Sequence, residues 1–157
     1  MDVDGVLTDG KIVIDGQGKE LKNFDVQDGF GIVVFQKVGY KTAIISARSA
    51  DAVTARVTDL KIHKVFQDAF PKIKAYEQLL SEFNVRDEEV CFVGDDWPDL
   101  GVLSRVGFAV AVANAVSEVK KTAHYVTKKK GGDGAVREII DLILKTQGKW
   151  KNILSGF

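Results

Sequence analysis

The stretch Met1-Asp2-Val3-Asp4-Gly5-Val6-Leu7-Thr8-Asp9-Gly10 organises the rest of the chain. In an extended segment alternate side chains point the same way, so Asp2 and Asp4 place two carboxylates side by side before Gly5 lets the backbone turn. Such a pair repels itself, so it persists only when a cation lies between the groups or when one of them binds a proton. Both conditions are typical of functional sites, and a polar Asp-Gly turn is the alternative interpretation.

Asp2 and Asp4 stand where the end of a strand is expected. In an α/β protein an apolar strand of about 5 residues holds such carboxylates at the C-terminal edge of a parallel sheet. Only Met1 precedes Asp2 in this sequence. The pattern is therefore compatible with a first strand that lies upstream of Met1 in the natural protein, where Met1 would be an internal residue.

Length and composition indicate the class of protein. The 157 residues are 45% hydrophobic, which suits a single domain over residues 1–157. Lys plus Arg and Asp plus Glu both number 22, so no overall basic field would recruit nucleic acid or an anionic membrane. The single cysteine, Cys91, cannot form an intrachain disulfide, and no apolar run reaches the ~20 residues that span a bilayer. We expect a soluble cytoplasmic protein.

A hairpin follows the acidic stretch, and strands then alternate with helices. Two short strands at 11–14 and 20–24 around the Gly-rich turn 15–18 predict a β-hairpin. Asp28 is expected to cap the first helix. The later strands are expected at 42–45, 64–67, 89–93 and 108–112, and the helices at 28–38, 49–60, from 71, from 98, at 116–123 and at 135–147. This order predicts a three-layer, Rossmann-like α/β fold, with a parallel sheet covered by helices on both faces.

The hairpin at 11–24 raises the question of what it packs against. An isolated hairpin is only marginally stable in water, so it must pack on its own domain or on another copy of the chain. We favour the second option, which predicts a closed homo-oligomer, a homotetramer.

Polar residues follow the ends of several predicted strands. They are Ser46, Lys72, Asp95, Asp96 and Asp99. An ammonium in the first turn of a helix, as at Lys72, opposes the helix dipole unless an anion binds there. Ser46 alone would equally satisfy backbone groups in a turn, and Asp96 would serve as an ordinary helix cap before Pro98.

Together with Asp2 and Asp4, the later acidic cluster forms a set of oxygen ligands that suits Mg²⁺ rather than zinc. His63 and His124 show no ligand spacing, so packing is the better interpretation for both. A carboxylate nucleophile, a neighbouring carboxylic acid, a hydroxyl, a lysine and Mg²⁺ together describe phosphoryl transfer through an aspartyl-phosphate.

These residues carry a resemblance to a known family. The run Asp-Val-Asp-Gly-Val-Leu-Thr-Asp-Gly at 2–10, then Ser46, Lys72 and Gly94-Asp95-Asp96-x-x-Asp99, resembles the four ordered motifs of the haloacid dehalogenase superfamily of phosphatases. The hairpin, Ser46-Ala47-Arg48 and Gly131-Gly132-Asp133-Gly134-Ala135-Val136-Arg137-Glu138 are similar to the capless 3-deoxy-D-manno-octulosonate 8-phosphate (KDO 8-phosphate) phosphatases. The resemblance implies an enzyme of lipopolysaccharide precursor synthesis in Gram-negative bacteria.

The resemblance also implies a role for each motif residue. Asp2 would attack phosphorus, and Asp4 would protonate the leaving sugar oxygen and then activate water. Mg²⁺ would bind the Asp2 carboxylate, the Asp4 backbone carbonyl and Asp95. Ser46 and Lys72 would hold the phosphoryl oxygens. The remaining implied site residues are Asp99, which would orient Lys72 or a metal-bound water, Asp96 beside the metal, and Gly5, Ala47 and Arg48 on the substrate side.

Two positions depart from the usual family pattern. This chain has Ser46-Ala47-Arg48 where the family usually has Ser-Gly-Arg. Trp97-Pro98 is bulky for a loop that is often smaller, and it would narrow the entrance to the site. Arg48 is expected at the mouth of the site, where its guanidinium would bind the carboxylate of a sugar-acid phosphate. A surface salt bridge to Asp51 or another acid is the alternative for Arg48.

Three other functions compete with this interpretation. A receiver domain uses similar groups, but it places the lysine after the phosphorylated Asp and late in the chain, whereas Lys72 precedes the second acidic cluster. A nonulosonate 9-phosphate phosphatase is the nearest alternative substrate class, and such enzymes tend to lack an Arg at the position of Arg48. A non-catalytic assembly domain, like those of sialic acid cytidylyltransferases, is disfavoured because Asp2 and Asp4 are intact.

Two segments outside the motifs have open interpretations. The lysine run 128–130 either attracts an anionic substrate or is simply solvated. The tail 146–157 carries Trp150 and Phe157 and is more apolar than a free tail should be. The family resemblance implies that it docks near a neighbouring subunit's site, and packing on its own domain is the alternative.

Overall fold

The structure, a computed structural model, describes residues 1–154, apart from the side chains of residues 152 and 154. The strands are β1 (Val13–Ile14), β2 (Glu20–Leu21), β3 (Ala43–Ile45), β4 (Lys64–Phe66), β5 (Cys91–Gly94), β6 (Phe108–Ala111) and β7 (Tyr125–Val126). The helices are α1 (Val26–Lys37), α2 (Asp51–Asp59), α3 (Lys72–Phe83), α4 (Leu100–Leu103), α5 (Ser117–Thr122), α6 (Ala135–Thr146) and α7 (Trp150–Leu154). Two short 3₁₀ helices, η1 (Asp87–Glu89) and η2 (Trp97–Asp99), precede and follow β5.

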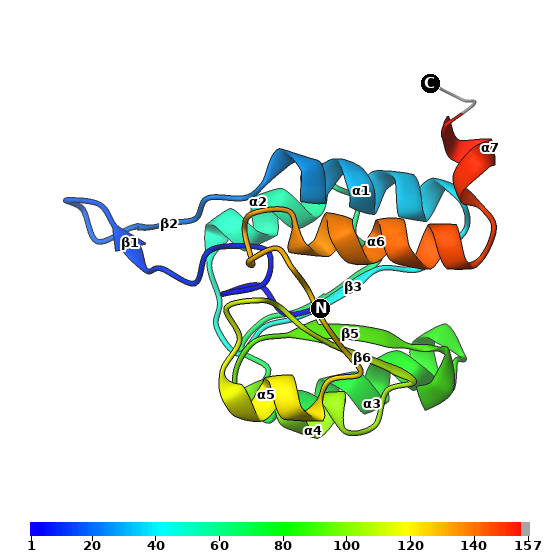
Figure 1. The fold of residues 1–157 in the computed structure, drawn as a ribbon. Helices are drawn as coiled ribbons and strands as arrows, with labels where there is room; N and C mark the ends of the chain where they lie inside the picture. The colour runs from blue at the N-terminus through cyan, green and yellow to red at the C-terminus, as the bar shows by residue number, and fades with distance from the viewer. Residues whose placement is uncertain (155–157) are drawn as a thin grey trace.

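Parallel strands form the middle layer of the molecule (Figure 1). β3 pairs with β4, while β6 pairs with both β5 and β7, all in parallel. Helices α1, α2 and α6 lie over one face of these strands, and α3, α4 and α5 lie over the other. The predicted three-layer α/β fold is confirmed. Because both faces are covered, β5 and β6 consist almost entirely of apolar residues and glycine.

The first two residues join the two groups of parallel strands. The Met1 amino group donates to the carbonyl of Ala43 at 3.1 Å, and the amide of Ile45 donates to the carbonyl of Met1 at 3.0 Å. On the other side the amide of Asp2 donates to the carbonyl of Val93 at 3.0 Å. Met1 and Asp2 therefore lie between β3 and β5 in the manner of a short central strand, and Asp2 reaches the C-terminal edge.

A cavity of about 510 Å³ lies beside Met1, toward the opposite edge of the sheet. Its walls come from β3, β5, α3 and the end of α1, and they include Met1, Ala43, Phe83, Cys91 and Phe108. Burial lowers the pKa of the Met1 ammonium to about 6, because a charge is poorly solvated there. This end of the central segment thus combines mainly apolar walls with a buried amino group.

The core is one continuous apolar cluster between the layers. Its largest fully buried side chains are Tyr76, Ile32, Ile45, Leu103, Leu144, Val3, Val6, Val102, Val110, Val112, Val119 and Val136. Val3 and Val6 belong to the acidic stretch itself and have no exposed surface. The loop that carries Asp2 and Asp4 is therefore fixed by buried apolar side chains, Val3 between the two acids and Val6 after them.

The cap of α1 differs from the prediction. The helix begins at Val26, and its N-cap is Asp25, whose carboxylate accepts the amides of Gln27 and Asp28. Asp28 lies within the first turn, is 1% exposed, and accepts the amide of Arg137 at 2.7 Å. The carboxylate of Asp28, on α1, therefore accepts a hydrogen bond from a backbone amide in the first turn of α6. The prediction of Asp28 as the N-cap was wrong, because Asp25 and Asp28 both precede the apolar positions of the helix and both can cap it.

Other boundaries shift by one to three residues from the prediction. α2 begins at Asp51 rather than at residue 49, after an N-cap, Ala50, that makes no side-chain bond. β5 begins at Cys91 rather than at residue 89, because the Glu89 carboxylate accepts the amide of Arg86 and closes the turn η1. Strand β7 and helix α7 were not predicted, since two and five residues are too short to establish a period.

The predicted hairpin is present but shorter than expected. β1 and β2 pair antiparallel with Val13 opposite Leu21, and the Asp15 carboxylate accepts the amides of Gln17 and Lys19 in the turn. The hairpin projects from the body of the molecule (Figure 1). The large apolar side chains that it exposes are Ile12, Val13, Ile14 and Leu21.

The C-terminal helix α7 packs on its own domain. Trp150 and Ile153 are partly buried against the core, and the ammonium of Lys145 lies 4.4 Å from the centre of the Trp150 ring. Between the two interpretations of the tail, the structure favours intramolecular packing for this part, while Phe157 lies outside the described residues. Within residues 1–154, no helix has the length and apolar character needed to cross a bilayer.

Candidate active site

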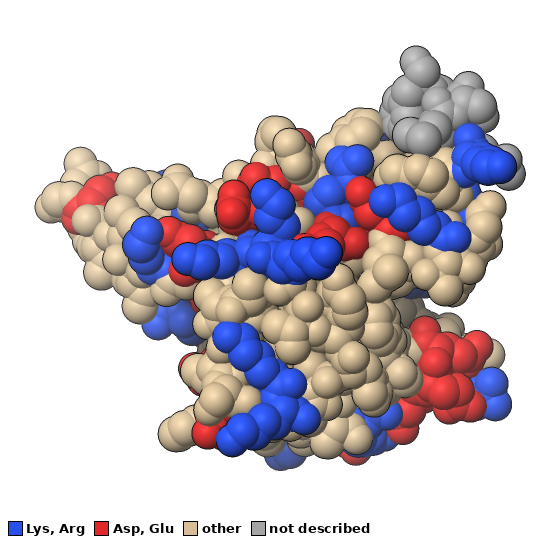
Figure 2. Space-filling view, in the orientation of Figure 1, with Lys and Arg blue, Asp and Glu red and all other residues tan. Residues whose placement is uncertain are grey.

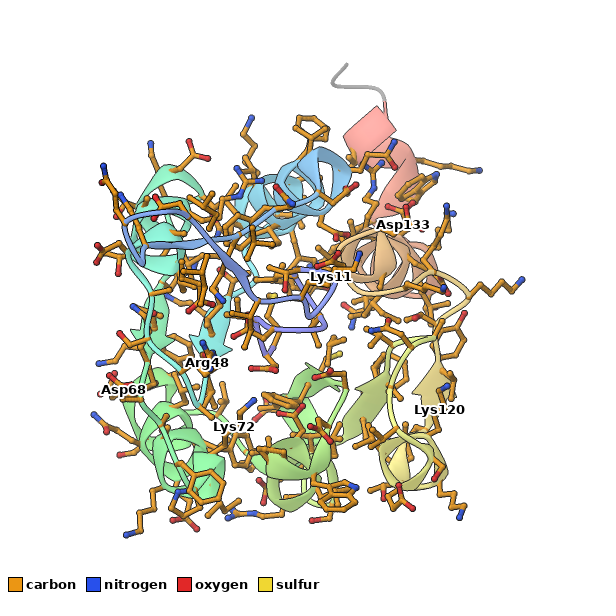
Figure 3. All side chains as sticks on the ribbon, turned by 90° about the vertical axis from the view of Figure 1, so that its left-hand side faces the viewer. Lys11, Arg48, Asp68, Lys72, Lys120 and Asp133 are labelled. Carbon is orange, nitrogen blue, oxygen red and sulfur yellow. The ribbon has the colours of Figure 1, made fainter. Side chains whose placement is uncertain are left out.

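The predicted site residues lie where the parallel strands end. Figure 3 looks onto this side of the molecule, and Arg48 and Lys72 lie near each other there, while Lys120 and Asp133 lie farther across the view. The strands β3 and β5 lead into the loops that carry Ser46 and Asp95. Loops at this edge collect polar groups because parallel strands all end there.

A buried ion-pair network forms the centre of the site. The Lys72 ammonium lies 2.6 Å from Asp2 Oδ1 and donates to Asp99 Oδ1 at 2.6 Å. The side chains of Lys72, Asp2 and Asp99 are 2%, 9% and 1% exposed. Burial lowers the pKa of Lys72, but the two carboxylates outweigh it and hold that pKa above its ordinary value. Lys72 is therefore a fixed positive charge at the first turn of α3.

Asp95 completes an acidic cluster beside this lysine. One oxygen each from Asp2, Asp95 and Asp99 lies within 4.8 Å of the others. Gly5 makes this approach possible: it has φ +89°, and a Cβ built on it would stand 2.0 Å from Asp95 Oδ2. Any side chain at position 5 would therefore push Asp95 out of the cluster.

The electrostatics of the cluster favour a cation. Burial and the neighbouring carboxylate of Asp99 raise the pKa of Asp2 to about 6, despite the contact with Lys72. Burial, then Asp2 and Asp99, raise the pKa of Asp95 to about 8. Asp95 Oδ1 is buried and has no hydrogen-bond partner among the described residues. An orphaned oxygen in an all-carboxylate cluster fits a hard divalent ion such as Mg²⁺, which would neutralise the excess negative charge.

Asp99 and Asp96 also organise the loop after β5. Asp99 Oδ2 accepts the amide of Asp95 at 2.9 Å, which fixes the peptide that carries the Asp95 side chain. Asp96 caps η2 by accepting the amide of Trp97, as its position before Pro98 indicated. Trp97 is 66% exposed and lies away from the buried centre. His63 and His124 bond within the fold, to Thr42 and to the amide of Ala109, as expected for packing.

The Asp4 carboxylate lies outside the acidic cluster and contacts the base of the hairpin. Asp4 Oδ1 accepts a hydrogen bond from the Lys22 ammonium at 2.5 Å, and the same ammonium donates to Glu20 at 2.7 Å. Sequence reasoning did not select Glu20 or Lys22. The available signal was their spacing, because residues two apart in an extended segment share a face. That spacing could not show that the face turns toward Asp4.

The segment after β3 carries a buried hydroxyl and an exposed guanidinium. Ser46 is 2% exposed, and its Oγ accepts the amide of Arg48 at 3.2 Å. Ala47 between them is half-buried. Arg48 donates to Glu20 at 2.9 Å and lies 3.8 Å from Asp4 Oδ2. The acid beside Arg48 therefore comes from the hairpin, and the suggested partner Asp51 is not the one that the structure shows.

The Gly-rich segment after β7 closes over the acidic loop. Asn114 bridges the two, because its amide group donates to the carbonyl of Gly5 and its oxygen accepts the amide of Gly131 at 2.7 Å. A Cβ on Gly131 would stand 1.7 Å from the Gly5 carbonyl oxygen, so only glycine allows this contact. The lysines 128–130 lie beside this segment with exposed side chains. Steering of a substrate by these lysines stays a prediction.

Comparison with known proteins agrees with this geometry. A family profile for haloacid dehalogenase-like hydrolases matches residues 32–139, which is more than half of the chain. The chain belongs to the haloacid dehalogenase-like hydrolases. A curated member of this family, the 3-deoxy-D-manno-octulosonate 8-phosphate phosphatase of Yersinia pestis, is 45% identical over 148 residues, covering 94% of this chain and 79% of the relative.

Solved structures of haloacid dehalogenase-like hydrolases also superpose closely. The KDO 8-phosphate phosphatase of Moraxella catarrhalis, solved with magnesium, phosphate and KDO, is 37% identical with a TM-score of 0.97, covering 100% of this chain and 90% of that chain. The cobalt-bound KDO 8-phosphate phosphatase of Haemophilus influenzae is 38% identical with a TM-score of 0.91, covering 94% of this chain and 86% of that chain. The fold and the family suggested by the motifs are therefore confirmed.

Proposed function

We propose that this chain is a Mg²⁺-dependent phosphomonoester hydrolase, and that its substrate is KDO 8-phosphate in lipopolysaccharide precursor synthesis in the cytoplasm. The observation that carries the proposal is the buried contact of Asp2 with Lys72 beside Asp95 and Asp99. A carboxylate held next to a fixed ammonium can approach an anionic phosphate, which it would otherwise repel. The similarity to KDO 8-phosphate phosphatases supports the substrate.

Asp2 and Asp4 perform the bond changes in the proposed reaction. An Asp2 oxygen forms a bond to phosphorus while the bond from phosphorus to the sugar oxygen breaks. The departing sugar oxygen takes a proton from the Asp4 carboxylic acid. The Asp4 carboxylate then removes a proton from water, whose oxygen attacks phosphorus. The bond from phosphorus to Asp2 breaks, which releases phosphate and regenerates the Asp2 carboxylate.

The other site residues hold the phosphate and the metal. Lys72 and the Ser46 hydroxyl would contact the phosphoryl oxygens, and the 2.6 Å hydrogen bond to Asp99 supports this position of Lys72. Asp2 and Asp95, with the Asp4 backbone carbonyl, would hold Mg²⁺. When bound, Mg²⁺ supplies positive charge next to the transferring phosphoryl group. Asp96 supports the loop that presents Asp95, while Gly5, Ala47 and Arg48 line the substrate side.

A phosphate-release assay tests this function. Purified protein is offered KDO 8-phosphate, a nonulosonate 9-phosphate and common sugar phosphates, with Mg²⁺ or with a chelator. We expect hydrolysis of KDO 8-phosphate that requires Mg²⁺, and Asp2→Asn should lose about 10³-fold or more in kcat because an amide cannot form the acyl phosphate. Preference for the nonulosonate ester would reassign the substrate, and full activity of Asp2→Asn would refute the mechanism.

We further propose that the hairpin assembles four chains into a homotetramer. Ile12, Ile14 and Leu21 on the hairpin are 56%, 62% and 46% exposed, although apolar side chains of this size are normally covered. A contact with a second copy would cover them. In that assembly the hairpin of one chain would roof the site of the next.

A further inference from the structure

Four charged side chains form a closed ring at the base of the hairpin. The Lys22 ammonium bonds to Asp4 Oδ1 at 2.5 Å and to Glu20 Oε1 at 2.7 Å. Arg48 Nη2 bonds to Glu20 Oε2 at 2.9 Å, and Arg48 Nε lies 3.8 Å from Asp4 Oδ2. Each carboxylate thus divides its two oxygens between Lys22 and Arg48. The two positive and two negative charges balance.

The two cations of the ring differ in burial. The Lys22 side chain is 1% exposed, whereas that of Arg48 is 47% exposed. A buried ammonium costs several kcal/mol unless its partners remain in place, so Lys22 constrains the positions of both carboxylates. Arg48 lies on the solvent side, where a substrate group could reach it. The ring therefore has an inner, fixed half and an outer, accessible half.

Fastening the hairpin to the body is the simpler role for such a ring. The members on the body, however, are Asp4 and Arg48, which are the two groups that the proposed reaction places on the leaving-group side. A general acid works only when its proton points at the departing oxygen, and errors of about 1 Å cost rate. Asp4 Oδ1 is engaged by Lys22, which leaves Oδ2, on the side of Arg48, as the oxygen able to carry the proton.

We propose that Lys22 and Glu20 are positioning residues for the leaving group: Lys22 orients the Asp4 carboxyl, and Glu20 holds Lys22 and Arg48 in place. This inference rests on the proposed phosphatase function and deepens it. It assigns the hairpin base to the same subunit's site, whatever the assembly of the chains. Neither residue touches the reacting atoms, so both act through Asp4 and Arg48.

Leaving-group dependence tests the proposal. A sugar oxygen needs a proton as it leaves phosphorus, whereas 4-nitrophenolate leaves without one. Lys22→Met should lower kcat/KM for the sugar-acid phosphate by about 10- to 100-fold and change kcat/KM for 4-nitrophenyl phosphate by less than about 3-fold. The ratio kcat/KM is used because it reports only the steps up to departure of the leaving group. Lys19→Met, on the exposed part of the same hairpin, is the matched control and should leave both values unchanged.

A conservative variant separates positioning from a merely structural role. Lys22→Arg keeps a positive charge with several N–H donors between Asp4 and Glu20, and it should restore sugar-acid phosphate hydrolysis relative to Lys22→Met. Glu20→Gln keeps the shape of the ring and should show the same selective loss, to a smaller degree, so it decides the matter if Lys22→Met does not fold.

Each outcome has a distinct meaning. Selective loss on the sugar-acid phosphate, with recovery in Lys22→Arg, supports the proposal. Equal loss on both esters, or no loss on either, overturns it while leaving the phosphatase function intact. A wild type that hydrolyses neither ester instead contradicts the proposed function itself.

Discussion

At the residue scale, the two acids of the first motif face different surroundings. Asp2 is buried against Lys72 beside Asp95 and Asp99, while Asp4 turns to the cations at the base of the hairpin. Alternation would place both carboxylates on one face, but the turn at Gly5 sends them to different partners. One motif thereby supplies groups suited to attack on phosphorus and to proton transfer at the leaving oxygen.

Arg48 is the residue whose loss should depend most on the substrate. Arg48→Ala should lower kcat/KM for a carboxylate-bearing sugar phosphate by about 10- to 100-fold, since a charge-assisted hydrogen bond contributes roughly 1.5 to 3 kcal/mol. An aryl phosphate has no carboxylate to lose and should be hydrolysed as before. Steady-state kinetics on both esters measures this, with Asp51→Ala as the control. Equal loss on both would assign Arg48 to the phosphate or to the fold.

Asp28 should make stability depend on pH. Burial raises the pKa of its carboxyl to about 6 in the folded chain, against about 4 when unfolded, and Oδ2 has no hydrogen-bond partner among the described residues. Below about pH 4 both states are protonated. As pH rises to about 6 only the unfolded state ionises freely, so the free energy of unfolding should fall by about 3 kcal/mol.

Asp28→Asn cannot ionise and should lack this fall, while its amide oxygen can still accept the amide of Arg137. Urea unfolding of both proteins from pH 4 to pH 7 measures the difference between the two curves. Asp59→Asn, at an exposed position, should follow the wild type. Parallel curves for wild type and Asp28→Asn would show that the folded pKa of Asp28 is not raised.

At the scale of elements, Met1 and Asp2 occupy the centre of the sheet. Met1 and Asp2 connect β3 with β5 through three backbone hydrogen bonds, and the 510 Å³ cavity continues along the same line. Beside the cavity, β3 and β5 face each other across the central segment, like strand edges that accept an added strand. This geometry makes a specific prediction about the central segment.

Four apolar, β-branched residues added before Met1 should stabilise the fold. They would fill the cavity, pair with β3 and β5, and replace the buried Met1 ammonium by an ordinary amide. Burial of each side chain contributes about 1.5 to 3 kcal/mol, and ordering its backbone costs about 1 to 2 kcal/mol, so a net gain near 2 kcal/mol is expected. The melting temperature should rise by about 4 to 8 °C. Four Gly and Ser residues are the control, and an equal melting temperature for both extensions would contradict the prediction.

At the scale of the whole molecule, the charges are balanced, and the hairpin carries a cluster of exposed apolar side chains. Lys and Arg side chains form bands in Figure 2 with Asp and Glu beside them, in keeping with 22 of each sign. The hairpin instead projects from the body with an apolar strand pair. Assembly through this element would remove that surface from water without requiring charge complementarity.

Ile14→Asp should therefore dissociate the proposed homotetramer. A charge at a side chain that is 62% exposed in one chain costs little there, but it would be buried without a partner in the interface. Light scattering at micromolar concentration should give a tetramer for the wild type and a smaller species for Ile14→Asp. Gln17→Asp at the turn is the control. A monomeric wild type would rule out the assembly.

The sequence by itself determined the order of strands and helices, and it identified the acids, the hydroxyl and the lysine that end the strands. These features depend on local periodicity and on the rule that parallel strands end at one edge, so they can be inferred without coordinates. The family resemblance implied that Asp99 would orient Lys72 or a metal-bound water, and the structure shows a hydrogen bond of 2.6 Å between Lys72 and Asp99.

Only the tertiary structure decided which side chains meet across long sequence separations. Lys22 and Asp4 are brought together by the docking of the hairpin base, and Asp28 reaches Arg137 because α1 and α6 lie side by side. Neither contact follows from local sequence, since several acids and lysines would fit each position equally well. Packing of whole elements selects one partner, because a buried charge is stable only where its counter-charge is also held.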